Sequence, residues 1–345
     1  MEIGISSFVE TTPDVETGKT ISHAERLREV VEEIVLAERV GLDVYGVGEH
    51  HRADYAASSP AVVLAAAAAL TTKIRLTSAV TILSALDPVR VFQDFATLDG
   101  LSNGRAEIMA GRGTFIESFP LFGYDLKDYD ELFNERLDLL LQIRESEKIT
   151  WSGKHRAAID NLGVYPRPIQ NPLPIWIGSA GNKDSAIRAG RLGLPLALAM
   201  IEGDPLQFAE NIQLYKQAAQ ESGHDVTKLQ IAAHSHGFIA DDTKTALEKF
   251  YPSTYARKNI RAIETGKPPY TRSDYDTACQ FEGAMYVGDP EVVAQKIIHL
   301  NKQLGITRFF LHVPLATMPH ADVMRAIELL GTEVAPRVRE AVARG

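Results

Sequence analysis

The chain has 345 residues, of which 45% are hydrophobic and 23% charged, so it is long and apolar enough to bury the core of a large globular domain. Its net charge of −9 and pI near 5.6 argue against a surface for nucleic acid or anionic membranes. One cysteine, Cys279, excludes an internal disulfide, and no apolar run is long enough to span a bilayer. We therefore expect a soluble, cytoplasmic protein.

Strand and helix patterns alternate along the chain. Apolar, β-branched runs predict strands, and apolar residues at helical spacing predict helices. The predicted strands cover 3–8, 44–48, 74–83, 105–110, 174–179, 194–200, 229–239 and 306–313. The predicted helices cover 23–40, 60–70, 89–101, 126–147, 183–192, 205–222, 243–263, 290–304 and 321–343.

This alternation predicts an α/β fold, a (β/α)8 TIM barrel that forms a single domain over 1–345. An open, doubly wound sheet is the alternative. Two stretches, near 150–174 and 265–285, lack a strong period and are expected to be irregular inserts.

The strand at 44–48 ends in the polar sequence Glu49-His50-His51. A strand covered on both faces carries few polar residues along its length, so such residues collect where it emerges. In a barrel that end is the C-terminal face, where active sites lie. His50 is the first catalytic candidate, and an ordinary pKa near 6.5 would suit it to proton transfer. Glu49 could orient an imidazole or only satisfy the strand end.

Two later strand ends are suited to an anion. Arg112, flanked by two glycines, carries a permanent charge that fits a phosphate or carboxylate, although it could equally pair with a surface acid. In 178–185 a strand ends in small residues and runs directly into a helix, whose N–H groups and dipole attract anions. Lys183 and Ser185 could add side-chain donors there. Ordinary βα turns have similar sequences, so this second signal is weak alone.

Together these motifs resemble the bacterial luciferase-like flavin monooxygenase family. The likeness is carried by GVGEHH, SAVTILSALDPVR, LSNGR leading to GRG, LFG, and the small-residue loop before RAGRLGLPL, in that order from residue 46 to residue 196. The resemblance implies a luciferase-like (β/α)8 barrel that binds FMN, supplied in reduced form by a separate flavin reductase, or sometimes a deazaflavin. It also implies O2 and a small organic molecule as substrates, and a homodimer.

Residue matching within this resemblance assigns further roles. His50 matches the catalytic histidine of the luciferases. Arg112 and the loop after the fifth strand would hold the flavin phosphate. A non-prolyl cis peptide is expected near Ser78, so that Ala79 and Val80 would lie beside the flavin ring. The loop residues expected at the phosphate are Gly181, Asn182, Lys183 and Ser185.

Two departures from the luciferase pattern stand out. Asp130 stands where luciferase has a further phosphate-binding arginine, which leaves Lys127 as the nearest cation in sequence. Gly111 stands where luciferase has a reactive cysteine. Light emission from a long-chain aldehyde is therefore not implied, and neither the substrate nor the choice between FMN and deazaflavin follows from the sequence.

His234 and His236 lie two apart on the seventh predicted strand, so they point to one face and could contact flavin or substrate, as could Glu49 and His51. With His50 and His312 they could instead bind a metal, which makes a metal-dependent hydrolase the rival class. That class lacks the HxH expected on the first strand, and we expect no metal. A flavin-binding barrel without catalysis is a third hypothesis. The alanine-rich helix at 60–70 is expected to pack against a second subunit or deep against the barrel.

Overall fold

The computed structural model describes residues 1–14, 17–113, 115–314, 316 and 318–344. Eight parallel strands close into a barrel, because β10 pairs with both β9 and β12, and β1 pairs with both β12 and β2. This closure confirms the (β/α)8 fold, and the open sheet is wrong. The barrel strands are β1 (Glu2–Ser7), β2 (Val44–Val47), β3 (Arg75–Ser78), β5 (Ala106–Gly111), β8 (Ile175–Ser179), β9 (Leu196–Ala199), β10 (Ile231–Ile239) and β12 (Arg308–His312).

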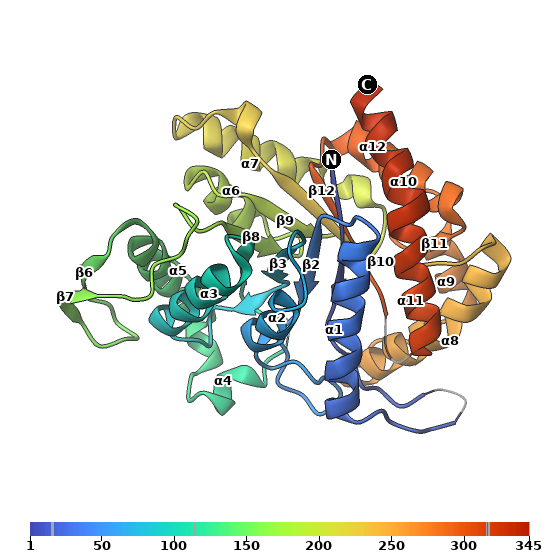
Figure 1. Cartoon of the computed structure of the whole chain (residues 1–345), viewed down its shortest axis with the longest axis horizontal. Helices are drawn as coiled ribbons and strands as arrows, with labels where there is room; N and C mark the ends of the chain where they lie inside the picture. Colours follow the sequence, from blue (N-terminus) through green and yellow to red (C-terminus); the bar gives the residue numbers. More distant parts are fainter. Residues whose placement is uncertain (15–16, 114, 315, 317, 345) are drawn as a thin grey trace.

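Helices follow the strands and surround the barrel (Figure 1). Within the described residues no helix is both long and apolar enough to cross a membrane. The helices are α1 (His23–Arg39), α2 (Pro60–Ala68), α3 (Pro88–Ser102), α4 (Ser118–Leu121), α5 (Tyr129–Glu145), α6 (Lys183–Arg191), α7 (Ala209–Glu221), α8 (Thr243–Thr265), α9 (Arg272–Cys279), α10 (Pro290–Leu304), α11 (His320–Leu329) and α12 (Ala335–Arg344).

Local sequence explains where these helices begin. Asp87 and Asp289 accept hydrogen bonds from first-turn N–H groups of α3 and α10, and each is followed by proline, which suits the first helical position. Asn182 caps α6 in the same way. Ser59 occupies the N-cap position of α2 but makes no side-chain capping bond.

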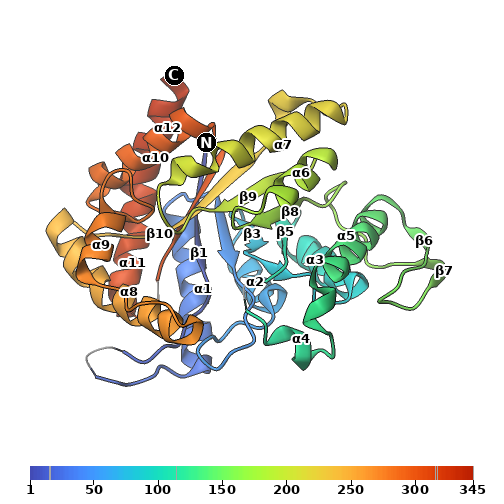
Figure 2. The same ribbon diagram turned by 180° about the vertical axis from the view of Figure 1, so that it is seen from behind.

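The structure corrects the prediction of irregular inserts. The stretch 150–174 contains most of an antiparallel hairpin, β6 (Lys148–Trp151) and β7 (Ile159–Gly163), which projects beyond α5 (Figures 1 and 2). The stretch 265–285 contains α9, which begins at a capping box. A short strand, β11 (Tyr286–Gly288), then pairs with β10. These elements are too short to give a periodic pattern.

Two predicted elements are interrupted. The strand expected at 74–83 is divided into β3 and the two-residue β4 (Thr81–Ile82), both of which pair with β5. The helix expected at 321–343 has a π-helical turn (Leu330–Val334) between α11 and α12.

The barrel interior is layered from its N-terminal to its C-terminal end. At the N-terminal end Arg308 is buried and binds Glu107 at 2.6 Å. An apolar layer follows, made of Val44, Met109, Trp176, Ala197, Ala232 and Phe310. These layers close the barrel at its N-terminal end. The polar ends of β1, β2 and β10 therefore point toward the opposite, C-terminal opening, here called the mouth. In Figures 1 and 2 the mouth is the lower end, toward which β1 runs, and α4 and α8 lie near it.

Candidate active site

The third barrel strand is interrupted by a non-prolyl cis peptide between Ala79 and Val80, at the place expected from the resemblance. The Val80 side chain lies against two glycines of neighbouring strands. A Cβ added to Gly111 would be 2.5 Å from Val80 Cγ2, and one added to Gly178 would be 2.7 Å from Val80 Cγ1. The chain therefore has no room at position 111 for the cysteine found in luciferase.

Glu49 is buried at the end of β2 and is fully engaged. Its Oε2 accepts the Ile82 N–H at 2.9 Å, which holds β4 in place, and its Oε1 lies 2.8 Å from His51 Nε2. The imidazole that Glu49 orients is thus that of His51. His50 points elsewhere.

His50 lies among aromatic rings. It stacks on Tyr55 with ring centroids 4.1 Å apart, and Phe8 and Phe115 approach to 4.9 and 5.5 Å. Its Nδ1 is buried without a hydrogen-bond partner among the described residues. Burial lowers the pKa of His50 to about 3, below the ordinary value near 6.5. At neutral pH the ring is uncharged, with one nitrogen that can donate and one that can accept.

His234 joins His312 through a shared hydroxyl. Ser6 Oγ lies 2.8 Å from His234 Nε2 and 3.3 Å from His312 Nδ1. The other side of the His312 ring contacts Glu10, at 3.2 Å. Burial lowers the pKa of His234 to about 3 and that of His236 well below its ordinary value, so both rings are neutral. His236 Nδ1 and Glu10 Oε2 lack hydrogen-bond partners among the described residues.

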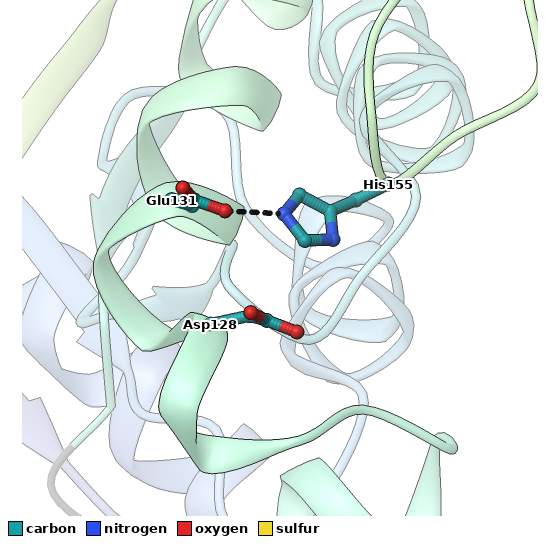
Figure 3. A group of neighbouring side chains, drawn as sticks. All are labelled: Asp128, Glu131 and His155. Atoms are coloured by element: carbon teal, nitrogen blue, oxygen red, sulfur yellow. Dashed lines mark hydrogen bonds and ion pairs between the residues drawn. The ribbon is translucent and has the colours of Figure 1, made fainter.

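These histidines do not converge as metal ligands would. Across the described part of the chain, one group of three His, Cys, Asp or Glu side chains has its ligand atoms within 4.8 Å of one another: Asp128, Glu131 and His155 (Figure 3). That group lies beside α5. Glu131 Oε2 already accepts from Lys154 Nζ at 2.6 Å and lies 3.1 Å from His155 Nε2, so a lysine occupies the place of a cation. The ligand set of the rival hydrolase is therefore not assembled.

Arg112 and Ser185, 73 residues apart, meet at the other side of the mouth. Arg112 Nη2 lies 3.4 Å from Ser185 Oγ, and Nη1 donates to Asp130 at 2.6 Å. The Asp130 carboxylate is 72% exposed, so a phosphate could replace it at Arg112. Ser185 stands in the first turn of α6, where the helix dipole also favours an anion.

The other loop residues proposed for the phosphate have structural partners. Asn182 Oδ1 accepts the Ser185 N–H at 2.8 Å, and Lys183 Nζ binds Glu210 at 2.5 Å, on α7. Gly181 has a positive φ of 98°, which favours glycine, and its carbonyl accepts from Asn211. Of the four loop residues, Ser185 is the one whose side chain the structure brings to Arg112.

Arg188 was missed by the sequence analysis. It follows Ser185 by three residues on α6, lies 5.5 Å from the Phe133 ring centroid, and has a buried Nη1 without a partner among the described residues. Burial, and then the neighbouring charge of Arg112, lower its pKa. Lys127 instead pairs with Asp125 at 3.0 Å on the surface. The second cation near Arg112 is therefore Arg188, and its spacing from Ser185 on a predicted helix was the available signal.

Comparison with known proteins identifies the family. Residues 1–308 match the luciferase-like monooxygenase family. The chain belongs to this family. N-acetyl-S-alkylcysteine monooxygenase of Bacillus subtilis is 26% identical over 316 residues, which cover 86% of this luciferase-like chain and 90% of that protein.

Three solved structures have the same fold. Monooxygenase RslO1 of Streptomyces bottropensis has a TM-score of 0.83 at 23% identity, with 97% of this chain and 99% of that one covered. The FMN complex of the oxygenating constituent of 3,6-diketocamphane monooxygenase from Pseudomonas putida has a TM-score of 0.77 at 21% identity, with 98% of each covered. A coenzyme F420-dependent tetrahydromethanopterin reductase of Methanopyrus kandleri has a TM-score of 0.74 at 22% identity, with 98% and 99% covered.

The relatives differ in the cofactor that they use. Luciferase-like proteins use FMN or the deazaflavin F420, and both kinds occur among proteins similar to this chain. The chain is accordingly a luciferase-like oxidoreductase of the flavin- or F420-dependent family.

Proposed function

We propose that this protein is a two-component monooxygenase that uses reduced FMN and O2 to oxygenate a small organic substrate. The observation that supports it most is the meeting of Arg112 and Ser185 beside the cis Ala79–Val80 segment. Val80 lies against Gly111, the residue before Arg112, so the phosphate anchor and the site for the ring are adjacent. A flavin mononucleotide carries a planar ring and a phosphate at its two ends, which fits this arrangement.

Different residues would bind the phosphate, support the flavin ring and exclude water. Reduced flavin, when bound, supplies the electrons that activate O2. Arg112, Ser185 and the dipole of α6 bind the phosphate, with Gly181, Asn182 and Lys183 shaping the loop that presents it. Ala79 and Val80 support the ring, and the apolar walls around Phe8 and Phe115 exclude water.

The neutral His50 holds or accepts a proton at Nδ1, the nitrogen that has no hydrogen-bond partner among the described residues. Glu49 fixes His51 beside it, while His234 and His236 line the same part of the mouth, where the Phe8 ring lies 4.9 Å from His50 and 5.8 Å from His234. Because burial keeps the rings of His50, His234 and His236 uncharged, negative charge that develops in the reaction would raise their pKa toward neutrality.

Flavin titration tests the anchor. Purified protein is titrated without oxygen with reduced FMN, reduced F420 and reduced lumiflavin, which lacks the phosphate. Arg112→Met should weaken FMN binding roughly ten- to a hundredfold, the range of a charged hydrogen bond, and leave lumiflavin binding unchanged. Arg90→Met, at an exposed arginine of α3, is the control. Failure of every flavin to bind would refute the proposal.

A deazaflavin-dependent oxidoreductase is the second candidate, because the F420-dependent relatives share the fold. Clear preference for reduced F420 in the same titration would favour it. Reduced FMN reacts with O2 even when it is free in solution, so what separates an enzyme from a mere binding protein is whether the rate of reoxidation of bound reduced FMN depends on His50. His50→Gln should retain FMN affinity and change that rate about a hundredfold or more if His50 handles the proton.

We further propose that each chain forms a single barrel domain and that two chains form a homodimer. In the cytoplasm a separate reductase would supply this dimer with reduced FMN. The dimer is supported by Val62 of α2 and the following Leu70, which are 70% and 62% exposed. Light scattering of the wild type and of a Val62→Glu, Leu70→Glu variant tests it, and an unchanged monomer mass in both would refute it.

A further inference from the structure

Arg257 projects from α8 toward the mouth, and it has no acidic partner among the described residues. Its Nη2 donates to the Tyr55 hydroxyl, and its guanidinium carbon lies 5.5 Å from the Tyr55 ring centroid. Its Nη1 is buried, and in the part of the chain that the structure describes this nitrogen has no hydrogen-bond partner and no carboxylate lies within 4.0 Å of the guanidinium. A buried donor left unsatisfied on a permanent cation is costly unless a ligand completes it.

Two neighbouring arginines show what is unusual about Arg257. Arg52 and Arg261 also lie over the Phe115 ring, at 4.6 and 4.9 Å, and Arg257 is 5.7 Å from it. Arg52 pairs with three carboxylates, and Arg261 pairs with Glu264 at 3.2 Å. Of these three guanidiniums around one ring, Arg257 alone lacks an acid among the described residues.

Arg257 lies close to the polar residues of the mouth, His50 among them. Tyr55, which accepts from Arg257, stacks on His50. The charge of Arg257 acts on Glu10, His50 and His236, and each of these three residues also has a buried polar atom without a partner in the described part of the chain. The Phe8 ring lies 4.9 Å from that of His50 and 4.1 Å from that of His312, and His312 contacts Glu10 at 3.2 Å and lies 5.0 Å from the His236 ring. Arg257, Glu10, His50 and His236, each with an unsatisfied atom, thus lie near one another although they come from separate segments.

We propose that the substrate carries an anionic group, most simply a carboxylate, which Arg257 binds so that the rest of the molecule lies against His50. The oxygenation of this substrate rests on the proposed function, whereas its recognition does not. A planar guanidinium with a free Nη1 and a shared Nη2 suits a carboxylate. The Phe8 and Phe115 rings suit an apolar body joined to it.

The flavin phosphate does not satisfy this requirement. Its proposed anchor joins β5 to α6, which follows β8, whereas Tyr55 follows β2 and His236 belongs to β10. In the closed barrel β12 and β1 lie between β10 and β2, and β5 and β8 lie on the other side. Arg112 and Arg257 therefore serve opposite sides of the mouth, so one phosphate does not reach both.

Matched carboxylates and amides test the proposal. FMN-loaded protein is titrated with benzoate and benzamide, phenylacetate and phenylacetamide, and octanoate and octanamide, with binding followed by saturation-transfer NMR. Each pair differs mainly in charge. We expect at least one carboxylate to bind roughly ten- to a hundredfold more tightly than its amide. Arg257→Gln should abolish that preference, and Arg257→Lys should restore part of it.

Arg261→Gln is the matched control, because it removes an acid-paired arginine from the same helix and ring; the preference should persist. Thermal unfolding of each variant checks that it is folded. Absence of any carboxylate preference in the wild type, or its survival in Arg257→Gln, overturns the proposal. FMN affinity is measured in parallel. A wild type that binds no FMN refutes the proposed function, and an Arg257→Gln variant with tenfold weaker FMN binding makes Arg257 a flavin ligand and overturns the inference.

Discussion

Replacement of Gly111 by alanine tests the packing that shapes the proposed ring site. A Cβ at this position would lie 2.5, 2.9 and 3.1 Å from three carbon atoms of Val80. Carbon atoms normally approach to about 3.5–4.0 Å, so the overlap is about 1 Å. Because the Val80 side chain also lies against Gly178, it cannot move aside freely. We expect Gly111→Ala to lower the free energy of unfolding by about 1–3 kcal/mol, the usual cost of overpacking.

Urea unfolding at neutral pH measures this change, and a double-mutant cycle assigns it to Val80. Val80→Ala removes two of the three carbon atoms that Gly111→Ala would strike, including the nearest one at 2.5 Å. The double variant should be more stable than the sum of the single changes predicts, by about 1 kcal/mol or more. Gly100→Ala is the control, since Gly100 lies within α3 with nothing within 4 Å of an added Cβ. It should stabilise the helix by about 0.5–1 kcal/mol.

Additive effects in that cycle would refute the packing argument, because they would place the cost of Gly111→Ala somewhere other than Val80. A neutral Gly111→Ala would refute it directly. Reduced FMN binding supplies a second measurement. If Val80 supports the ring, Gly111→Ala should weaken binding of lumiflavin and FMN alike, whereas Arg112→Met should affect FMN alone.

Three further predictions concern charge. Arg188→Met should weaken FMN binding about tenfold in low salt and less in high salt, with no effect on lumiflavin, as measured by titration. Asp130→Ala should tighten FMN binding roughly two- to fivefold, because it frees Arg112 from an exposed ion pair; weaker binding would contradict this. The folded pKa of His50 is about 3, below the ordinary value near 6.5, so the unfolded chain binds more protons between these limits and stability falls as pH drops below about 6.5. Urea unfolding should show that the stability of the wild type relative to His50→Gln falls by about 2 kcal/mol between pH 7.5 and pH 5.

The fold could be predicted because most of its elements are long enough to show a period. Strands largely buried on both faces, such as β9, are continuously apolar, and most helices span several turns. The hairpin of β6 and β7 and the eight-residue α9 were missed because each is held by local turns and caps, which a periodic pattern does not register. The family resemblance predicted the cis peptide near Ser78. The break between β3 and β4 was missed, because nothing in the apolar pattern of 74–83 marks it.

The part of the candidate site that one strand end forms by itself could be predicted from the sequence. Glu49 and His51 lie two residues apart in an extended segment, so their side chains can point the same way, and the structure pairs them. That spacing was present in the sequence, but the motif drew attention to His50. The low pKa of His50 was not predictable, because Phe8 and Phe115 bury it from segments distant in the chain.

The partners of the arginines at the mouth could not be predicted from the sequence, for a different reason. Whether an arginine is paired depends on side chains that reach it from elsewhere: Tyr55 and Arg257 are separated by 202 residues, and Arg112 and Ser185 by 73. Arg257 could equally have met a carboxylate, as Arg112 and Arg261 do. Burial keeps the His50 ring neutral, and the guanidinium groups of Arg112 and Arg257, which are permanent cations, lie on opposite sides of the mouth. Such a site would bind most tightly a pair of ligands that places one anion at each arginine and the reacting atoms between them. A flavin with its phosphate and an anionic substrate would together supply this arrangement.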